Sequence, residues 1–382
     1  MEVVNAARDA RLAALGFDVD RQRLAREYKR KRLAMSVVRI VVYVVISAWL
    51  LTGFTFTVAG WASAFGGGPL QYALYATLLY FLYWVPVIPL GILGGFVLER
   101  KYGVSVQGLR SWLADAAKSL AIGIGFSLVA VEVVYLLLAA TPLWWLYAWL
   151  LGMGLGVVLA WLGPVVIAPL FYRFELIADE ALASRLRALA ERAGTKVVGV
   201  FRMVASAKTT RAFGGLAGIG STRRIILSDT LLNRYTPEEV ETVIAHELAH
   251  HAHRDTLRLT VAGALAGLVG LLAVDRVLLA AVPTLRLSGP ADIAGLPLVA
   301  LTIATVSTAI GPVLNGLSRR WEAAADVFAL RMTGNYSAFA STMVKIHDQN
   351  LGVADPHPFV EFLFHDHPSG RRRVETALRW RS

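Results

Sequence analysis

The chain has 382 residues, of which 56% are hydrophobic and only 17% are charged. Soluble proteins carry about 25% charged residues, so this composition excludes a protein surrounded by water on all sides. There is no cysteine, which excludes disulfides and thiolate metal sites, so any metal must be bound by histidines and carboxylates. The net charge of +11 favours basic loops at a membrane surface over nucleic-acid binding, and we expect no nucleic-acid partner.

Six stretches are apolar enough and long enough to cross a lipid bilayer as helices: 37–60, 70–98, 119–141, 143–170, 257–282 and 295–316. A polar, basic segment precedes the first of them, so this stretch is not a cleaved signal peptide. Lysine and arginine are concentrated at both ends of the chain and in alternate loops. This asymmetry predicts that both termini face the cytoplasm. We expect a multi-pass protein, in the plasma membrane of a prokaryote.

These spans divide the chain into five parts. Residues 1–36 form a basic cytoplasmic segment, and 37–170 hold four transmembrane helices. Residues 171–256 and 317–382 are rich in charge and form the two halves of one cytoplasmic domain, separated by the transmembrane hairpin 257–316. The predicted fold is therefore a mainly α membrane protein with about six transmembrane helices and a cytoplasmic α+β domain.

The first half of that domain contains both kinds of secondary structure. Ile177–Ala193 has helical spacing and ends at a glycine, whereas Val197–Val204 and Arg224–Ser228 are β-rich and read as strands. Thr236 is followed by Pro-Glu-Glu, which supplies an N-cap, a proline at the first helical position and an acidic residue at the third. A helix is predicted to start there and to continue through about His253.

That helix contains the sequence His-Glu-Leu-Ala-His at positions 246–250. Residues four apart share one helix face, so His246 and His250 can reach the same metal ion. Glu247 points elsewhere and can act as general base towards a water molecule at the open metal position. Downstream, Glu322 can complete a two-histidine, one-glutamate set, and Asp326, one turn later, can orient a ligand imidazole.

The alternative interpretation is a solvated helix with scattered histidines, since His251 and His253 lie in the same region. The capped helix, the apolar residues that precede His246 and the downstream carboxylate all favour a metal site. Three ionisable residues also lie inside predicted spans, namely Glu132, Asp275 and Arg276. For these we favour a structural ion pair between Glu132 and Arg276 over a lining of a polar cavity or a catalytic role.

The chain resembles the type 1 CaaX prenyl protease family, with the bacterial HtpX-type proteases as more distant relatives. Four stretches beyond the histidine motif carry the resemblance: Glu99–Val104, Arg224–Leu232, Asn315–Glu322 with Asp326, and the His-Pro-Ser element at His367 with Arg373. The resemblance implies a gluzincin-type metalloprotease domain that cleaves peptide bonds and binds one Zn²⁺. It implies His246, His250 and Glu322 as zinc ligands and Glu247 as the base.

The resemblance also suggests that His367 donates a hydrogen bond to the oxyanion and that Arg373 braces the acidic group around the metal. A second His-Pro, at His357, has Leu363 where the matching arginine should be, so we assign it no role in catalysis. By alignment, Arg211-Ala212-Phe213 stands where the family usually has Asn-Ala-Tyr in its substrate-binding strand, so the polar asparagine contact is absent.

We therefore expect a membrane-embedded zinc endopeptidase that hydrolyses peptide bonds of membrane-associated or misfolded proteins, by Glu-assisted attack of zinc-bound water. One alternative is a CaaX prenyl endopeptidase acting on prenylated C-termini, and another is a non-enzymatic membrane scaffold with a degenerate protease fold. The expected partners are peptide or protein substrates and the lipid bilayer. The sequence leaves the oligomeric state open.

Overall fold

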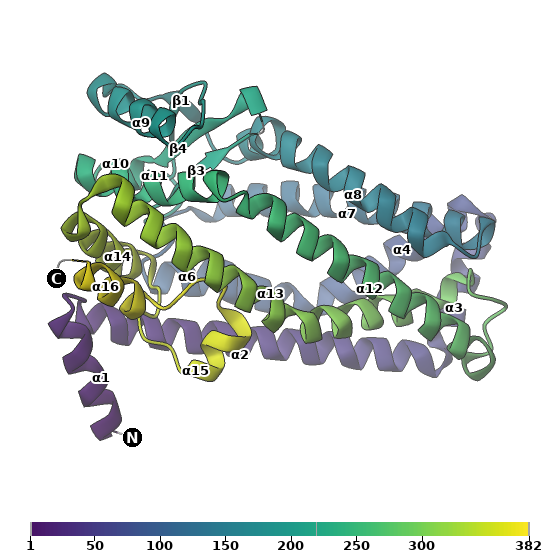
Figure 1. Ribbon diagram of the computed structural model, residues 1–382. Coiled ribbons are helices and arrows are strands. Elements are labelled where there is room, and N and C mark those ends of the chain that lie inside the picture. Colours follow the sequence, from purple (N-terminus) through teal and green to yellow (C-terminus); the bar gives the residue numbers. More distant parts are fainter. Residues whose placement is uncertain (1, 219, 381–382) are drawn as a thin grey trace.

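The computed structural model describes residues 2–218 and 220–380 and consists mainly of helices (Figure 1). Within that part of the chain, six helical segments are long and apolar enough to cross a membrane, as judged by length and composition: Val19–Ser63, Pro69–Lys101, Leu109–Ala140, Trp144–Leu170, Asp255–Leu285 and Ile293–Thr333. The prediction of about six spans is therefore confirmed.

The first two spans are interrupted, whereas the later ones are nearly continuous. Their helices are α2 (Val19–Trp49), α3 (Thr55–Ser63), α4 (Pro69–Trp84), α5 (Ile88–Ile92), α6 (Leu98–Lys101), α7 (Leu109–Ala140), α8 (Trp144–Leu162), α12 (Asp255–Leu285) and α13 (Leu296–Thr333). A π-helical turn joins α2 to α3, and its Gly53 has a φ of 131°. Glycine permits this bend because it has no Cβ to clash in that region.

The six spans are arranged as a ring. Each packs against the next along the chain, and α13 returns to α2 (Figure 1). At the end far from the strands, all six contribute to one buried apolar cluster, which we call the outer cluster: Leu50, Val58, Ala62, Tyr75, Leu79, Tyr135, Leu138, Trp144, Val274, Leu278, Ile293 and Val299. Elsewhere along the ring, residues of α8, α12 and α13 line a cavity of about 980 Å³.

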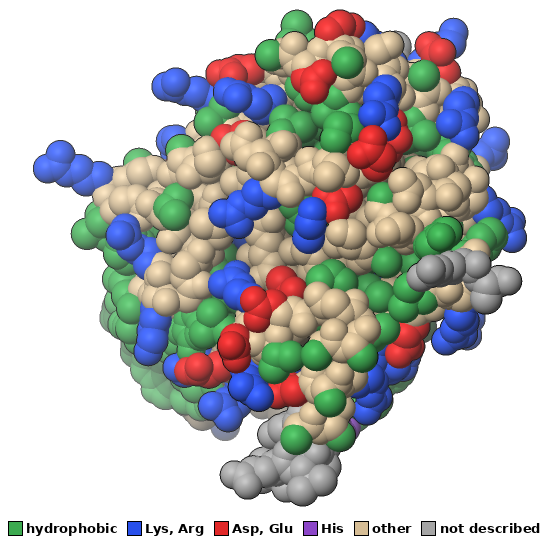
Figure 2. All heavy atoms as spheres, turned by 90° about the vertical axis from the view of Figure 1, so that its left-hand side faces the viewer, with side chains coloured by type: hydrophobic (Ala, Val, Ile, Leu, Met, Phe, Trp, Pro, Cys, Tyr) green, Lys and Arg blue, Asp and Glu red, His purple; other side chains and the backbone are tan. Residues whose placement is uncertain are grey.

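The remaining elements form the soluble part, which has a small mixed sheet in the order β1-β2-β4-β3. The strands are β1 (Phe174–Leu176), β2 (Val200–Met203), β3 (Gly214–Ala217) and β4 (Arg224–Ser228), and the helices are α9 (Glu180–Arg192), α10 (Asp229–Leu232), α11 (Pro237–Ala252), α14 (Tyr336–Asn350), α15 (Pro358–Phe364) and α16 (Gly370–Arg379). Charged side chains are spread over this end of the molecule, as expected for a surface in contact with water (Figure 2).

The sheet and helices enclose one apolar core. Ile225 and Leu227 alternate along β4 and so point to the same side, where they pack with Leu186 of α9 and with Ile244 and Leu248 of α11. β4 pairs in parallel with β2 and antiparallel with β3. β3 is thus an edge strand, and it lies against α11.

The N-terminal segment belongs to this soluble part more closely than its sequence suggested. α1 (Glu2–Ala14) contributes Leu12 to the core just described, together with Phe17 from the following turn. Further along, α2 continues without a break from the polar segment into the membrane span. Its Tyr28 hydroxyl donates a 2.5 Å hydrogen bond to Glu99, which lies in the second span.

Most predicted elements of the soluble part are present. The strand expected at Val197–Val204 is shorter, and the helix expected from Ile177 begins at Glu180, because Asp179 caps it. No pattern in the sequence indicated β1, and β3 is so rich in glycine that it lacks the usual strand composition.

The expected ion pair between Glu132 and Arg276 is wrong. Arg276 lies 3.7 Å from the neighbouring Asp275, and its side chain is largely exposed. Asp275 is buried and accepts a hydrogen bond from the Trp144 indole at 2.9 Å. One carboxylate oxygen of Glu132 has no hydrogen-bond partner among the described residues. Sequence spacing placed both groups at a similar depth but could not show which face of each helix they occupy.

Candidate metal centre and active site

The helix that carries the histidine motif is fixed at its N-terminus. The Thr236 side chain accepts a hydrogen bond from the Glu239 backbone amide, and the Glu239 carboxylate accepts one from the Thr236 amide, which completes a capping box. The same carboxylate accepts hydrogen bonds from Ser341 at 2.6 Å and Lys345 at 2.8 Å. Because both of these residues lie on α14, Glu239 ties α11 to its neighbour.

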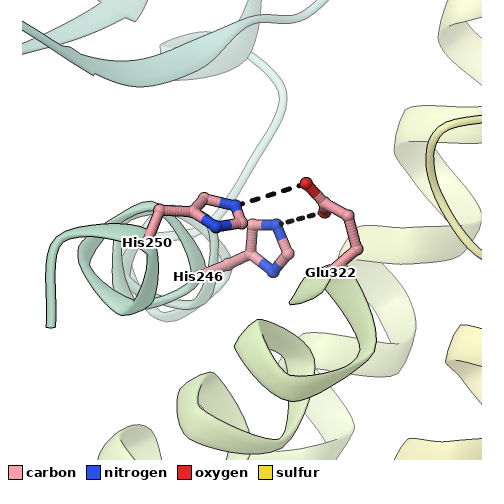
Figure 3. A group of neighbouring side chains, drawn as sticks. All are labelled: His246, His250 and Glu322. Carbon is pink, nitrogen blue, oxygen red and sulfur yellow. Dashed lines mark hydrogen bonds and ion pairs between the residues drawn. The ribbon is translucent and has the colours of Figure 1, made fainter. Parts of the chain in front are cut away.

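Three potential metal ligands meet between α11 and α13 (Figure 3). His246 and His250 project from the same face of α11 towards Glu322 on α13. His246 Nε2 lies 3.0 Å from Glu322 Oε2, and His250 Nε2 lies 3.4 Å from Glu322 Oε1. One ligand atom from each residue falls within 4.8 Å of the others. The spacing of four along α11 thus gives the convergence that the sequence suggested.

These positions fit a metal ion. A tetrahedral site with ligand distances of about 2.0–2.1 Å places its donors roughly 3.3–3.4 Å apart. The two measured contacts with Glu322 are close to that separation, so only small side-chain shifts are needed to admit an ion. The surroundings also favour positive charge. Burial alone would lower the pKa of His246, but its hydrogen bonds with Asp326 and Glu322 raise that pKa to about 9.

Each ligand histidine has a carboxylate at its other ring nitrogen. His246 Nδ1 lies 2.9 Å from Asp326, and Arg373 in turn donates to both oxygens of Asp326, at 2.5 and 2.9 Å. His250 Nδ1 lies 3.2 Å from Asp255, at the start of α12. Such contacts fix the orientation of an imidazole and present its free nitrogen to a metal.

Sequence reasoning anticipated Asp326 but missed Asp255. Asp255 follows His250 by only five residues, but this proximity along the chain does not by itself indicate a contact. A break in the helix is needed to bring it back to the imidazole, and that break occurs at Arg254, which has a positive φ of 57°. Nothing in the composition of this segment indicates such a conformation, because arginine is not a residue that favours it.

Glu247 lies beside the ligands without joining them. Burial raises the pKa of its carboxyl above the ordinary range, whereas His246 and His250 act in the opposite direction. A raised pKa brings a carboxylate closer to the value that suits a base working near neutral pH. The edge strand passes close to this group, since a Cβ atom placed on Gly215 would be 3.8 Å from Glu247 Oε2.

The two His-Pro elements of the tail occupy different places. His367 Nε2 lies 3.2 Å from Glu322, and its Nδ1 lies 2.8 Å from Asp366. The His367 side chain is 48% exposed, which leaves it accessible to a bound molecule. His357 instead caps α15 by accepting a hydrogen bond from the Phe359 amide. No contact between His357 and the three ligands occurs among the described residues.

The segment that leads into β3 is held on both sides. The Asn350 side chain accepts from the Ala212 amide and donates to the Ala212 carbonyl, at 2.8 and 3.0 Å. On the other side, Thr230 donates to the Arg211 carbonyl at 2.6 Å. The Arg211 guanidinium turns towards the second span and lies 3.0 Å from Glu99. Asn350 was not anticipated, because no motif marks it.

Comparison with known proteins gives the family. Residues 177–381 match the model of peptidase family M48, and residues 12–173 match the CAAX prenyl protease N-terminal model with five membrane helices. Among relatives, the chain is 30% identical over 288 residues to the uncharacterised metalloprotease YhfN of Bacillus subtilis, an alignment covering 74% of this chain and 68% of that protein.

Two further relatives and one structure extend this picture. A probable CAAX prenyl protease 1 of Schizosaccharomyces pombe is 26% identical over 290 residues, 74% of this chain and 60% of that protein. Protease HtpX of Legionella pneumophila is 30% identical over 216 residues, 53% of this chain and 72% of that protein. The crystal structure of S. mikatae Ste24p superposes with a TM-score of 0.83 at 20% identity, covering 94% of this chain and 89% of that one, and so shows a common fold.

The resemblance inferred from the motifs is thereby confirmed, together with the fold class of membrane helices joined to a small α+β protease domain. Family membership also implies a metal cofactor, and the cluster of His246, His250 and Glu322 supplies ligands for it. The chain belongs to peptidase family M48 and is a multi-pass membrane metalloendopeptidase.

Proposed function

We propose that the metal is zinc, held by His246, His250 and Glu322. Two imidazoles and one carboxylate with an open fourth position form the ligand set typical of catalytic zinc. When bound, zinc would lower the pKa of a water molecule and polarise the scissile carbonyl. Glu247, buried beside the ligands, would take the proton from that water and pass it to the leaving amine. The convergence of these side chains at one point carries the proposal.

The substrate would bind as an extended peptide along β3. This strand lies at the edge of the sheet and has a free side within the described structure, so its backbone can pair with another strand. Gly214 packs closely against Val243 and Leu231 of the core, and Gly215 lies beside Glu247, so a peptide paired with β3 would pass close to the proposed base. His367 would donate a hydrogen bond to the developing oxyanion, since its exposed imidazole lies next to Glu322.

The substrates would be membrane-associated or misfolded proteins. The position where related proteases usually carry asparagine holds Arg211, and its guanidinium is engaged with Glu99 and Tyr28, at 3.0 and 2.8 Å. A side chain held in this way contributes no obvious sequence-specific contact to a peptide on β3. Binding through the strand backbone suits many sequences. Removal of C-terminal residues from prenylated proteins is the alternative, supported by the names of several relatives.

The active site would face the cytoplasm of a prokaryote from the plasma membrane. The Lys and Arg asymmetry of the loops supports this orientation. Charged side chains are spread over the protease end in Figure 2, which suits an aqueous compartment.

Hydrolysis of an unfolded protein such as casein by the purified enzyme in detergent tests the proposal. Wild type should be active, a chelator should abolish activity, and added zinc should restore it. Glu247→Gln should keep stoichiometric metal and lose nearly all hydrolysis, because the ligands remain while the base is removed. Full activity in Glu247→Gln would refute the assignment. A matched pair of prenylated and unprenylated peptides distinguishes the two substrate classes, since only a CaaX protease requires the prenyl group.

A further inference from the structure

A second cavity lies along α13, and Asp326 and Arg373 separate it from the metal ligands. It has a volume of about 760 Å³ and is bounded by α13, α15 and α16. Val313, Leu317 and Phe362 give it an apolar wall, and Arg320 and Arg372 stand in its lining as cations. Figure 1 shows α15 and α16 beside the protease end of α13. Nothing in the proposed reaction uses this space.

Helix geometry turns most of the α13 residues of this cavity away from Glu322. Val313, Arg320 and Val327 recur every seven residues and therefore share one face of α13. Glu322 follows Arg320 by two residues, which is a rotation of about 200°, so it lies on nearly the opposite face. Val313 and Arg320 therefore point away from the metal site, whereas Asp326, four residues after Glu322, lies between that site and the cavity.

The cavity also lies at the height where α13 leaves the membrane. The apolar stretch of the span ends near Gly316, and two arginines follow within four residues. Val313, inside the apolar stretch, is 62% exposed in the absence of lipid. On α15, Phe359, Phe362 and Phe364 are more than half exposed. Large exposed apolar side chains beside a span end are typical of a segment that lies in the membrane interface.

The charge of the cavity is unbalanced. Arg320 has no ion pair among the described residues, and Arg372 makes one long contact of 3.4 Å with Glu361 while its side chain is 54% exposed. Arg319 uses its guanidinium on backbone carbonyls of α15. Two arginine side chains are thus available to an anion at the rim of an apolar wall. Arginine pairs readily with phosphate oxygens through its fork of N–H donors.

We propose that this cavity binds an anionic phospholipid from the surrounding leaflet. Arg320 and Arg372 hold the phosphate, and an acyl chain lies over Val313 and Phe362. Basic pockets beside transmembrane helices on the cytoplasmic side are suited to such headgroups. Asp326 and Arg373 form the inner wall of the cavity, so the lipid lies one layer of side chains from His246.

Native mass spectrometry of the detergent-purified protein, titrated with phosphatidylglycerol or phosphatidylcholine, tests the proposal. Wild type should bind phosphatidylglycerol preferentially. The double variant Arg320→Gln/Arg372→Gln should bind it about thirtyfold more weakly, at about 1 kcal/mol for each arginine near a phosphate. The matched control is Arg30→Gln/Arg110→Gln, which removes two exposed cations with no ion pair in the described residues of α2 and α7. It should bind like wild type.

Three results would overturn the inference. Unchanged binding by the Arg320/Arg372 variant would show that the lipid binds elsewhere. If the Arg30/Arg110 control bound phosphatidylglycerol as weakly as the Arg320/Arg372 variant, binding would depend on the total positive charge of the protein and not on this cavity. Glycerol phosphate has the headgroup charge without acyl chains, and it should compete poorly because the apolar wall contributes to binding. Competition as strong as that of the lipid would mean that the site binds free phosphate.

Discussion

The two carboxylates behind the ligand histidines should have similar effects on metal binding and different effects on folding. Asp255→Asn and Asp326→Asn each remove a negative charge from the outer nitrogen of one imidazole, at 3.2 Å from His250 and 2.9 Å from His246. Loss of such a partner weakens metal binding by about 10- to 100-fold. This corresponds to about 1.4–2.7 kcal/mol in each variant.

The two variants should differ in their free energy of unfolding. The second partner of Asp326 is Arg373, whose side chain is only 9% exposed, so the substitution leaves a buried cation poorly paired. Breaking a buried pair costs about 3–5 kcal/mol. The second partner of Asp255 is Arg258, which is 55% exposed and can be solvated once its partner is lost. That loss should cost less than about 1 kcal/mol.

Competition with a chromophoric zinc chelator measures the first effect, and thermal unfolding of the metal-free protein in detergent measures the second. Asp275→Asn is the control, since Asp275 is equally buried but bonds to Trp144 among residues of the outer cluster. It should retain wild-type metal affinity. The reasoning fails if Asp255→Asn binds zinc as tightly as wild type, or if metal-free Asp255→Asn unfolds as easily as metal-free Asp326→Asn.

Three further outcomes are expected. His367→Ala should lower kcat by about a hundred- to a thousandfold with KM and zinc content nearly unchanged, because the oxyanion forms only in the transition state, whereas His357→Ala should resemble wild type. A cysteine at Ser63 should be labelled from outside sealed cells, and one at Ser206 should not. Burial alone would raise the pKa of Glu239, but hydrogen bonds from Lys345 and Ser341 lower it, so this carboxylate stabilises the fold above about pH 4 and loses that contribution on acidification. Glu239→Gln should therefore reduce the melting temperature at pH 7 and flatten its acid dependence.

Each of these has a contrary result. If His357→Ala loses activity while His367→Ala keeps it, then the oxyanion role belongs to His357 and has been assigned to the wrong histidine. Labelling of the cysteine at position 206 in sealed cells would show that the protease domain faces outward, opposite to the predicted orientation. A melting temperature of Glu239→Gln equal to that of wild type at neutral pH would show that the link between α11 and α14 contributes nothing.

The features available from the sequence were those encoded by local patterns. Hydropathy gives the six spans, and the spacing of His246 and His250 on a capped helix gives half of the metal site. Glu322 was accessible as a suitable carboxylate downstream of the histidine motif, and the family resemblance supported it. Asp255 and Asn350 were not, since their positions depend on a left-handed turn at Arg254 and on the packing of α14 against the lead into β3. The Glu132–Arg276 prediction failed because depth in a membrane does not specify the direction of a side chain.

The outer cluster has a consequence for the membrane itself. A ring of six helices that contained water along its whole length would let ions leak between compartments. Here the far end is filled by tyrosine, tryptophan and aliphatic side chains contributed by every span, several of them wholly inaccessible to solvent. The outer cluster therefore closes the ring of spans at the end away from the metal ligands. Ions crossing the bilayer along the axis of the ring would have to pass this packed apolar layer, which therefore acts as a seal for the electrochemical gradient.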